Sequence, residues 1–322
     1  MNNVLNVFLT IDVEYTGMSY YEKNTSFKIP SSSLDCYVNG KSYGLPFIIE
    51  ILDKNSLKGN FFVEPFSKFY FGEEQLKRNI DHIRKNKHDI QLHLHPSWLI
   101  FKDGKKRSDN LYDYNLNQQA KLIAFGKSIL NKFRIKPIAF RACRFTANND
   151  TYLALKKNKI PISSNYNLAF LNKDCFIRLD KKINDVNNIS ETYEFPITNY
   201  MIRDLRTFLR YTYKPLQIGC TSFKSMVKVL EYAHKNKMNS VTLILHNFEF
   251  LDRRDKHWIK KPLKINKKIV ANFKNMGSYL KRNKDKYNVT TFSEFYKMIK
   301  RENLKFNNRF KIHKINSIYL PI

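Results

Sequence analysis

Short apolar runs alternate along this chain with longer segments of helical periodicity, and this alternation constrains the fold more than any other feature. The predicted strands are 4–11, 59–63, 89–93, 137–141, 160–164, 193–196, 240–245 and 287–291. The predicted helices are 44–54, 73–85, 115–132, 148–158, 221–236, 266–283 and 293–301. In the fifth of these helices the apolar positions at helical spacing are Met226, Val227, Val229, Leu230 and Ala233. Regular alternation of strands and helices predicts a parallel sheet or a barrel.

We therefore expect an α/β fold of the barrel kind. The 322 residues suffice for one large domain of this type, and the 43% of apolar residues can fill its core. Two polar stretches, 15–43 and 165–192, interrupt the pattern and predict long loops after strands. In barrel enzymes such loops form the face that carries the site. We expect one domain over residues 1–300, followed by a basic C-terminal extension, 301–322.

The formal net charge of +29 predicts attraction to polyanions such as acidic lipid headgroups, nucleotide-sugars or acidic glycans. Specific nucleic-acid binding is disfavoured, because the sequence has no zinc-finger spacing, arginine-rich arm or aromatic RNA-binding motif. The basic segment 301–322 has scattered apolar residues, which suit peripheral contact with an anionic membrane. Packing of this segment against the domain is the alternative.

The cysteines and the N-terminal segment indicate in which cellular compartment the protein is expected. Cys36, Cys143, Cys175 and Cys220 have no paired spacing and are expected to be reduced, structural thiols. The run 4–12 is too short for a signal peptide and meets an acid at once. No apolar run approaches the length of about 18 residues that a membrane span needs. We expect a cytoplasmic protein that can lie at the inner membrane surface.

Two acids stand at the end of the first predicted strand. Asp12 and Glu14 are two residues apart in Thr-Ile-Asp-Val-Glu, so they share a face if the strand continues that far. Two carboxylates facing one way repel each other unless a cation or a proton lies between them. One of them could bind a metal while the other serves as a base. Solvated acids at a strand end are the alternative.

Two histidines at the end of the third predicted strand are also two residues apart. His93 and His95 share a face in His-Leu-His-Pro, and paired imidazoles are a good partial site for a first-row metal such as zinc. The alternative is a pair of polar strand-end residues stacked on Trp98. His88 is an odd number of residues from His93, so it points to the opposite face of the strand, and we expect it at the surface.

Basic and imidazole groups end two further strands. Arg141 and Arg144 straddle the fourth strand end, where one of them could pair with a carboxylate and hold its position. Cys143 lies between them, but the other groups favour a water nucleophile over a thiol. The apolar strand 240–245 ends abruptly in His246, which is well placed to act as a general acid. A satisfied core histidine is the alternative for His246.

Together, the paired acids, His-x-His-Pro, the arginine and Leu-x-Leu-His, in this order on successive strands, resemble the polysaccharide deacetylases, the NodB-homology or carbohydrate-esterase-4 superfamily. The resemblance covers roughly residues 4–296 and implies a distorted (β/α) barrel, commonly of seven strands, that holds a divalent metal. By position Asp12 matches the family's catalytic base and Glu14 its metal-binding acid. His93 matches the first metal histidine. Arg141 resembles the arginine that orients the base, and His246 matches the histidine that protonates the leaving amine.

The sequence departs from the family pattern at several points. The usual second motif spaces its histidines four apart, and here that position is Ser97, so His95 is the expected third ligand. Adjacent aspartates are absent, so Asp12 and Glu14 could exchange roles, and Arg144 could replace Arg141. The fourth motif should fall near 164–167 or 194–196.

The resemblance implies a metal-dependent hydrolase that removes an N-acetyl group from a sugar, with zinc as the expected ion, in the synthesis of a surface polysaccharide such as capsule or lipopolysaccharide. The expected substrate is nucleotide-linked, lipid-linked or polymeric. Hydrolysis of another C–N amide on the same fold is one alternative. A catalytically silent barrel that binds glycans or polyanions is the other. The expected substrate contacts are Trp98, Arg144, Phe145 and Glu249.

Overall fold

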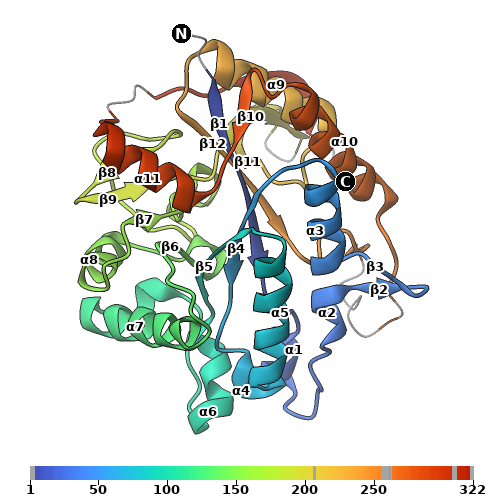
Figure 1. Ribbon diagram of the computed structural model, residues 1–322, viewed down its shortest axis with the longest axis vertical. Coiled ribbons are helices and arrows are strands. Elements are labelled where there is room, and N and C mark those ends of the chain that lie inside the picture. Colours follow the sequence, from blue (N-terminus) through green and yellow to red (C-terminus); the bar gives the residue numbers. More distant parts are fainter. Residues whose placement is uncertain (1–3, 206–207, 255–260, 262, 307–309, 320–322) are drawn as a thin grey trace.

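A computed structural model describes residues 4–205, 208–254, 261, 263–306 and 310–319. Its main feature is a curled, nine-stranded sheet wrapped by helices (Figure 1). Seven of its strands follow one another in parallel, in the order β12, β1, β4, β5, β6, β7, β9. Their bounds are Ser240–His246, Leu5–Val13, Gly59–Val63, Asp89–Leu94, Ala139–Ala142, Ile162–Ser163 and Thr192–Glu194. The predicted distorted (β/α) barrel is confirmed.

Two further strands and some irregular backbone complete the barrel. β8 (Asn187–Ile189) adds an antiparallel edge to β9, and β13 (Tyr287–Val289) pairs with the first residues of β1. Between β9 and β12 the ring is completed by backbone hydrogen bonds of irregular segments. Thr198 N–H donates to Thr242 O at 3.1 Å, and Ile218 N–H donates to Ile244 O at 3.1 Å. The barrel is therefore distorted at this seam.

The seven predicted helices all form, and they surround the sheet (Figure 1). Their bounds are α3 Leu45–Lys54, α5 Glu73–Lys85, α7 Leu116–Lys132, α8 Asn149–Lys157, α9 Phe223–Lys235, α10 Lys267–Arg282 and α11 Phe292–Glu302. Each buries an apolar stripe, as Ile80 and Ile83 do on α5. Among the described residues, no helix has the length and apolarity needed to cross a membrane.

The stretches predicted as loops hold short elements. Residues 15–43 contain α1 Met18–Lys23, α2 Ser32–Asp35 and the hairpin of β2 Tyr37–Val38 with β3 Lys41–Ser42. Two more short helices, α4 Lys68–Phe71 and α6 Ile100–Asp103, follow β4 and β5. The sequence did not predict the hairpin of β10 (Asn199–Asp204) and β11 (Arg210–Pro215).

The C-terminal segment forms β14 (Lys314–Tyr319), which pairs in parallel with β10. The three strands make a small second sheet in the order β11, β10, β14. Of the two alternatives for 301–322, packing against the rest of the chain is therefore observed for this strand. The division at residue 300 stays a prediction.

The expectation that His88 lies at the surface was wrong. Its side chain is fully buried, with Nδ1 accepting a hydrogen bond from Gly59 N–H at 3.3 Å and the ring packed against Phe61. The parity argument was right, because His88 and His93 do lie on opposite faces. In a parallel sheet, however, helices cover the outer face as well, so neither face is exposed.

Candidate metal centre

Alternation along β1 carries one set of side chains from the closed end of the barrel to its open end. Phe8 packs against Phe292 and Phe295 of α11, which fills the barrel interior there. Two residues later, Thr10 Oγ1 accepts a hydrogen bond from the Arg141 side chain, which lies inside the barrel. Asp12 and then Glu14 follow on the same face. The apolar side chains that alternate with these residues face the outer helices. Because successive side chains of a strand point to opposite faces, both acids point into the barrel.

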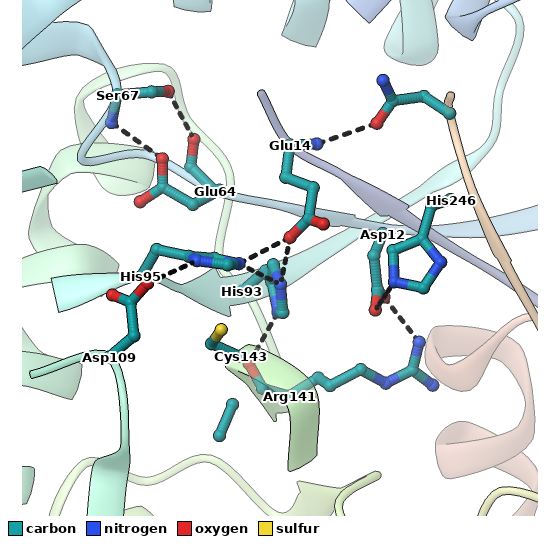
Figure 2. A network of polar contacts seen from close by, with 12 residues as sticks. Asp12, Glu14, Glu64, Ser67, His93, His95, Asp109, Arg141, Cys143 and His246 are labelled. Atoms are coloured by element: carbon teal, nitrogen blue, oxygen red, sulfur yellow. Dashed lines mark hydrogen bonds and ion pairs between the residues drawn. The ribbon is translucent and has the colours of Figure 1, made fainter. Parts of the chain in front are cut away.

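Glu14, His93 and His95 converge on one point at the open end (Figure 2). The Oε2 atom of Glu14 lies 3.0 Å from His93 Nε2 and 2.5 Å from His95 Nε2. The two Nε2 atoms lie 3.2 Å apart. A tetrahedral ion with ligand bonds of about 2.0–2.1 Å separates its ligand atoms by roughly 3.3 Å. The two separations that involve His93 are near this value, and a small outward shift of Glu14 or His95 would bring the third to it, so the three atoms can form one face of the coordination shell of a small divalent ion.

Hydrogen bonds on the far side of each ring select the tautomer that a metal needs. His93 Nδ1–H donates to the carbonyl oxygen of Arg141 at 2.9 Å, and His95 Nδ1–H donates to Asp109 Oδ2 at 3.1 Å. With the proton on Nδ1, each Nε2 presents a lone pair to the convergence point. This carboxylate–histidine and carbonyl–histidine arrangement is the usual support of metal-binding imidazoles.

The charges around the triad favour a positive group between its ligand atoms. Burial would raise the pKa of Glu14, but His95 and His93 hold it well below its ordinary value. Burial would likewise lower the pKa of His95, but the carboxylates of Glu14 and Asp109 raise it well above the ordinary value. A proton or a cation at this place is therefore stabilised.

Asp109 was not predicted from the sequence. It lies in irregular backbone after α6, where no periodic pattern indicates which way a side chain points. Its Oδ1 accepts a hydrogen bond from Ser97 N–H at 2.8 Å while Oδ2 holds His95. Ser97, four residues after His93, thus supports the His95 imidazole indirectly, through Asp109.

A second acid, Asp12, forms a buried ion pair next to the triad. Arg141 Nη1 donates to Asp12 Oδ1 at 2.6 Å, and both side chains are almost completely buried. The guanidinium is held further by Thr10 Oγ1 at 3.0 Å and Ser164 Oγ at 2.9 Å, and it stacks over the ring of Phe62. These contacts fix the position of the Asp12 carboxylate. Arg144 instead projects outward, with its side chain 61% exposed.

His246 stands on the other side of Asp12. Its Nε2 lies 3.8 Å from Asp12 Oδ2, and its Nδ1–H donates to Glu249 Oε1 at 2.7 Å. Burial would lower the pKa of His246, but the hydrogen bond and charge of Glu249 raise it above the ordinary value. Glu249, expected to contact substrate, lies fully buried behind the imidazole, where Gln217 Nε2 also donates to it.

Asn247 was also missed by the sequence reasoning. Its Oδ1 accepts from Glu14 N–H at 2.9 Å and its Nδ2 donates to Ser33 O at 2.8 Å. It therefore ties the end of β1 to the 15–43 segment. The only available signal was its position directly after His246 at a strand end.

A cleft of about 760 Å³ opens beside Glu14 and His95, within the size range of small-molecule sites. Arg144 and Lys106 are exposed residues of its lining. Trp98 contributes to the lining but is only 1% exposed, and Phe145 is only 7% exposed and lies near Phe170. Neither ring therefore offers an open face for stacking on a sugar, contrary to expectation.

Cys143 lines the same cleft and lies close to His95 and Asp109. Burial raises the pKa of its thiol to about 11, so the sulfur is protonated at neutral pH. A protonated thiol is a weak nucleophile.

Solved structures of other proteins match nearly the whole chain. A candidate polysaccharide deacetylase from Mycobacterium smegmatis is 15% identical, covers 97% of this chain and 96% of its own, and has a TM-score of 0.56. The 4-alpha-glucanotransferase from Thermococcus litoralis is 10% identical over 91% of this chain and 40% of its own, with a TM-score of 0.54. The peptidoglycan deacetylase PdaC from Bacillus subtilis is 12% identical over 94% and 95%, with a TM-score of 0.42. The chain has the fold of the polysaccharide deacetylases.

The resemblance drawn from the motifs is thus confirmed for the fold. No family model matches the sequence, and no curated protein sequence matches it significantly. The polysaccharide deacetylase fold is also close to that of a glucanotransferase, which carries out different chemistry. The function must therefore be argued from the side chains of the site rather than from the fold.

Proposed function

We propose that this protein is a metal-dependent hydrolase that removes an N-acetyl group from a sugar. The observation that carries the proposal is the triad of Glu14, His93 and His95, in which both imidazoles are held in the metal-binding tautomer. A buried acid, Asp12, and a third histidine, His246, stand beside it and can serve as the base and the acid of amide hydrolysis.

The triad would hold one divalent cation. Two imidazoles and one carboxylate, with room for a further ligand, are the donor set of a catalytic zinc site. Such a cation supplies polarisation of a carbonyl oxygen and a lower pKa for water. The same donor set would accept other first-row metals, and zinc is our choice because both nitrogen ligands are imidazoles.

Asp12 would act as the general base and His246 as the general acid. Arg141 holds the Asp12 carboxylate in place, where it can accept a proton from the attacking water. Glu249 raises the pKa of His246, so the imidazolium persists long enough to donate its Nε2 proton to the departing amine. Asp12 and His246 lie opposite each other on the paired strands β1 and β12, so both side chains would be within reach of one bound amide.

The size of the cleft favours a sugar over a small ring amide. About 760 Å³ accommodates a hexose with a substituent or a neighbouring residue. The substrate class is an N-acetylated sugar in a polymer or on a nucleotide or lipid carrier, and the process is synthesis of a surface polysaccharide in the cytoplasm or at its membrane. In this proposal the basic segment 301–322 contacts an anionic membrane.

Metal analysis and acetate release test the proposal together. We expect one divalent ion per chain, and release of acetate from a panel of N-acetylated sugars as oligomers and as uridine-diphosphate derivatives. His93→Gln should lose the ion, whereas Arg144→Gln, at the cleft but outside the triad, should keep it. Absence of a stoichiometric ion would favour a silent binding protein. A bound ion without acetate release from any sugar would favour another amide as the substrate.

A further inference from the structure

Three large apolar side chains are exposed at the turn of the hairpin formed by β10 and β11. Leu205 is 54% exposed, Phe208 is 96% exposed and Leu209 is 42% exposed. Phe208 and Leu209 also adopt the left-handed backbone conformation, which non-glycine residues rarely take. Arg203 and Arg210 are exposed on either side of them. The turn therefore presents apolar groups flanked by cations.

A strongly basic helical surface occurs on α10 and its neighbour α9. α10 has no acidic residue, and its exposed cations are Lys267, Lys268, Lys274, Lys281 and Arg282. Among described residues, none of these five cations lies within ion-pair distance of a carboxylate. α9 adds the exposed cations Lys224, Lys228 and Lys235 against the single acid Glu231.

Direct contacts connect this helical surface to the hairpin. Asn272 of α10 accepts a hydrogen bond from Phe223 N–H of α9 at 3.3 Å. At the other end of α9, Tyr232 stacks near His313, just before β14. β14 in turn pairs with β10, where Lys314 lies opposite Met201. The basic helices, the C-terminal strand and the hairpin therefore form one connected part of the molecule.

We propose that this part of the molecule, the basic helices α9 and α10 with the hairpin turn at Leu205, Phe208 and Leu209, docks on an anionic phospholipid bilayer. The cations would lie at the headgroups, and the turn would enter the interfacial region. A soluble polyanion would be attracted by the same cations but has no apolar phase to receive Phe208. The combination of basic residues with an exposed aromatic and aliphatic group is typical of peripheral membrane contacts.

Sedimentation of the full chain with lipid vesicles tests this proposal. We expect binding to vesicles of phosphatidylcholine mixed with phosphatidylglycerol, weak binding to pure phosphatidylcholine, and loss of binding as salt is raised. The double variant Phe208→Ser, Leu209→Ser should weaken partitioning about tenfold or more. Lys281→Gln and Arg282→Gln should each weaken it about fivefold.

Leu153→Ser is the matched control, because Leu153 is 43% exposed but lies on α8, outside the proposed docking surface. It should bind vesicles like the unaltered chain, and circular dichroism should show all variants folded. Absence of binding to the anionic vesicles would overturn the proposal, as would equal losses in the Leu153 and Phe208 variants. Binding to a soluble anionic polysaccharide but not to vesicles would also overturn it. None of these outcomes depends on the deacetylase proposal, because no substrate is used.

Discussion

Replacing Arg141 by Met should remove more stability than any exposed arginine can. The change leaves Asp12 buried without its partner and removes the hydrogen bonds to Thr10 and Ser164. Breaking a buried ion pair on one side costs about 3–5 kcal/mol. Because domains are stable by only about 5–15 kcal/mol, this loss is a large fraction of the total.

Arg144→Met is the control, since it makes the same chemical change three residues away on a side chain that is 61% exposed. Its cost should be about 0.5 kcal/mol or less. Urea unfolding followed by circular dichroism, with equal slopes in both variants, gives the two values. If Arg141→Met costs under about 1 kcal/mol, or no more than Arg144→Met, the ion pair does not have the strength we assign to it.

The double variant Arg141→Met, Asp12→Asn measures the interaction between the two side chains. If the two side chains stabilise each other, the cost of both changes together should fall short of the sum by about 1 kcal/mol or more. Additive costs would show that each group is held by its other neighbours rather than by its partner.

Three further outcomes follow from the same contacts. Asp109→Asn should weaken zinc binding about 10–100-fold in a calorimetric titration, since it loosens the support of His95, and unchanged affinity would contradict that role. Glu249→Gln should lower the pKa of His246 in an NMR titration and move the alkaline limb of activity to lower pH, because the imidazolium loses its charged acceptor; an unmoved pKa would count against it. Burial lowers the pKa of His88 from 6.5 to about 4, so the unfolded chain takes up this proton first and stability falls as pH drops through that interval, by up to about 3 kcal/mol. His88→Asn keeps an acceptor for Gly59 N–H and should flatten this part of the pH–stability curve, and an equally steep curve would refute the assignment.

The regular elements were predictable because each is specified locally. The apolar run 59–63 and the helical pattern 73–85 form a strand and a helix with those same bounds, β4 and α5. The β10–β11 hairpin was not predictable in the same way. Most side chains of β11 are half-exposed, and β10 gains its second partner from β14, more than a hundred residues later in the chain. Pairing over such a distance leaves no periodic signal in either segment.

The site residues that could be predicted also lie in regular elements or at their ends, and those that could not be predicted lie outside them. Asp12, Glu14, His93 and Arg141 could be placed because strand alternation determines which way a strand-end side chain points. Asp109 lies in irregular backbone, so nothing in the sequence relates it to His95. Glu249 was expected to contact substrate but lies buried against His246. β12 ends at His246, and the turn that follows folds the Glu249 carboxylate back beneath the imidazole.

The curl of the sheet brings the separate strand ends together into one site. Neighbouring strands lie about 4.8 Å apart, so β1 and β6, with β4 and β5 between them, would be roughly 14 Å apart in a flat sheet. An arginine side chain could not cross that distance, yet Arg141 of β6 contacts Asp12 of β1 at 2.6 Å. It does so by passing over Phe62 of β4, inside the curve of the sheet. The same curvature brings Glu14 of β1 to His93 of β5, two strands away. The ligand triad and the Asp12–Arg141 pair are therefore both consequences of barrel curvature, and a change that flattened the sheet at β4 should loosen both together.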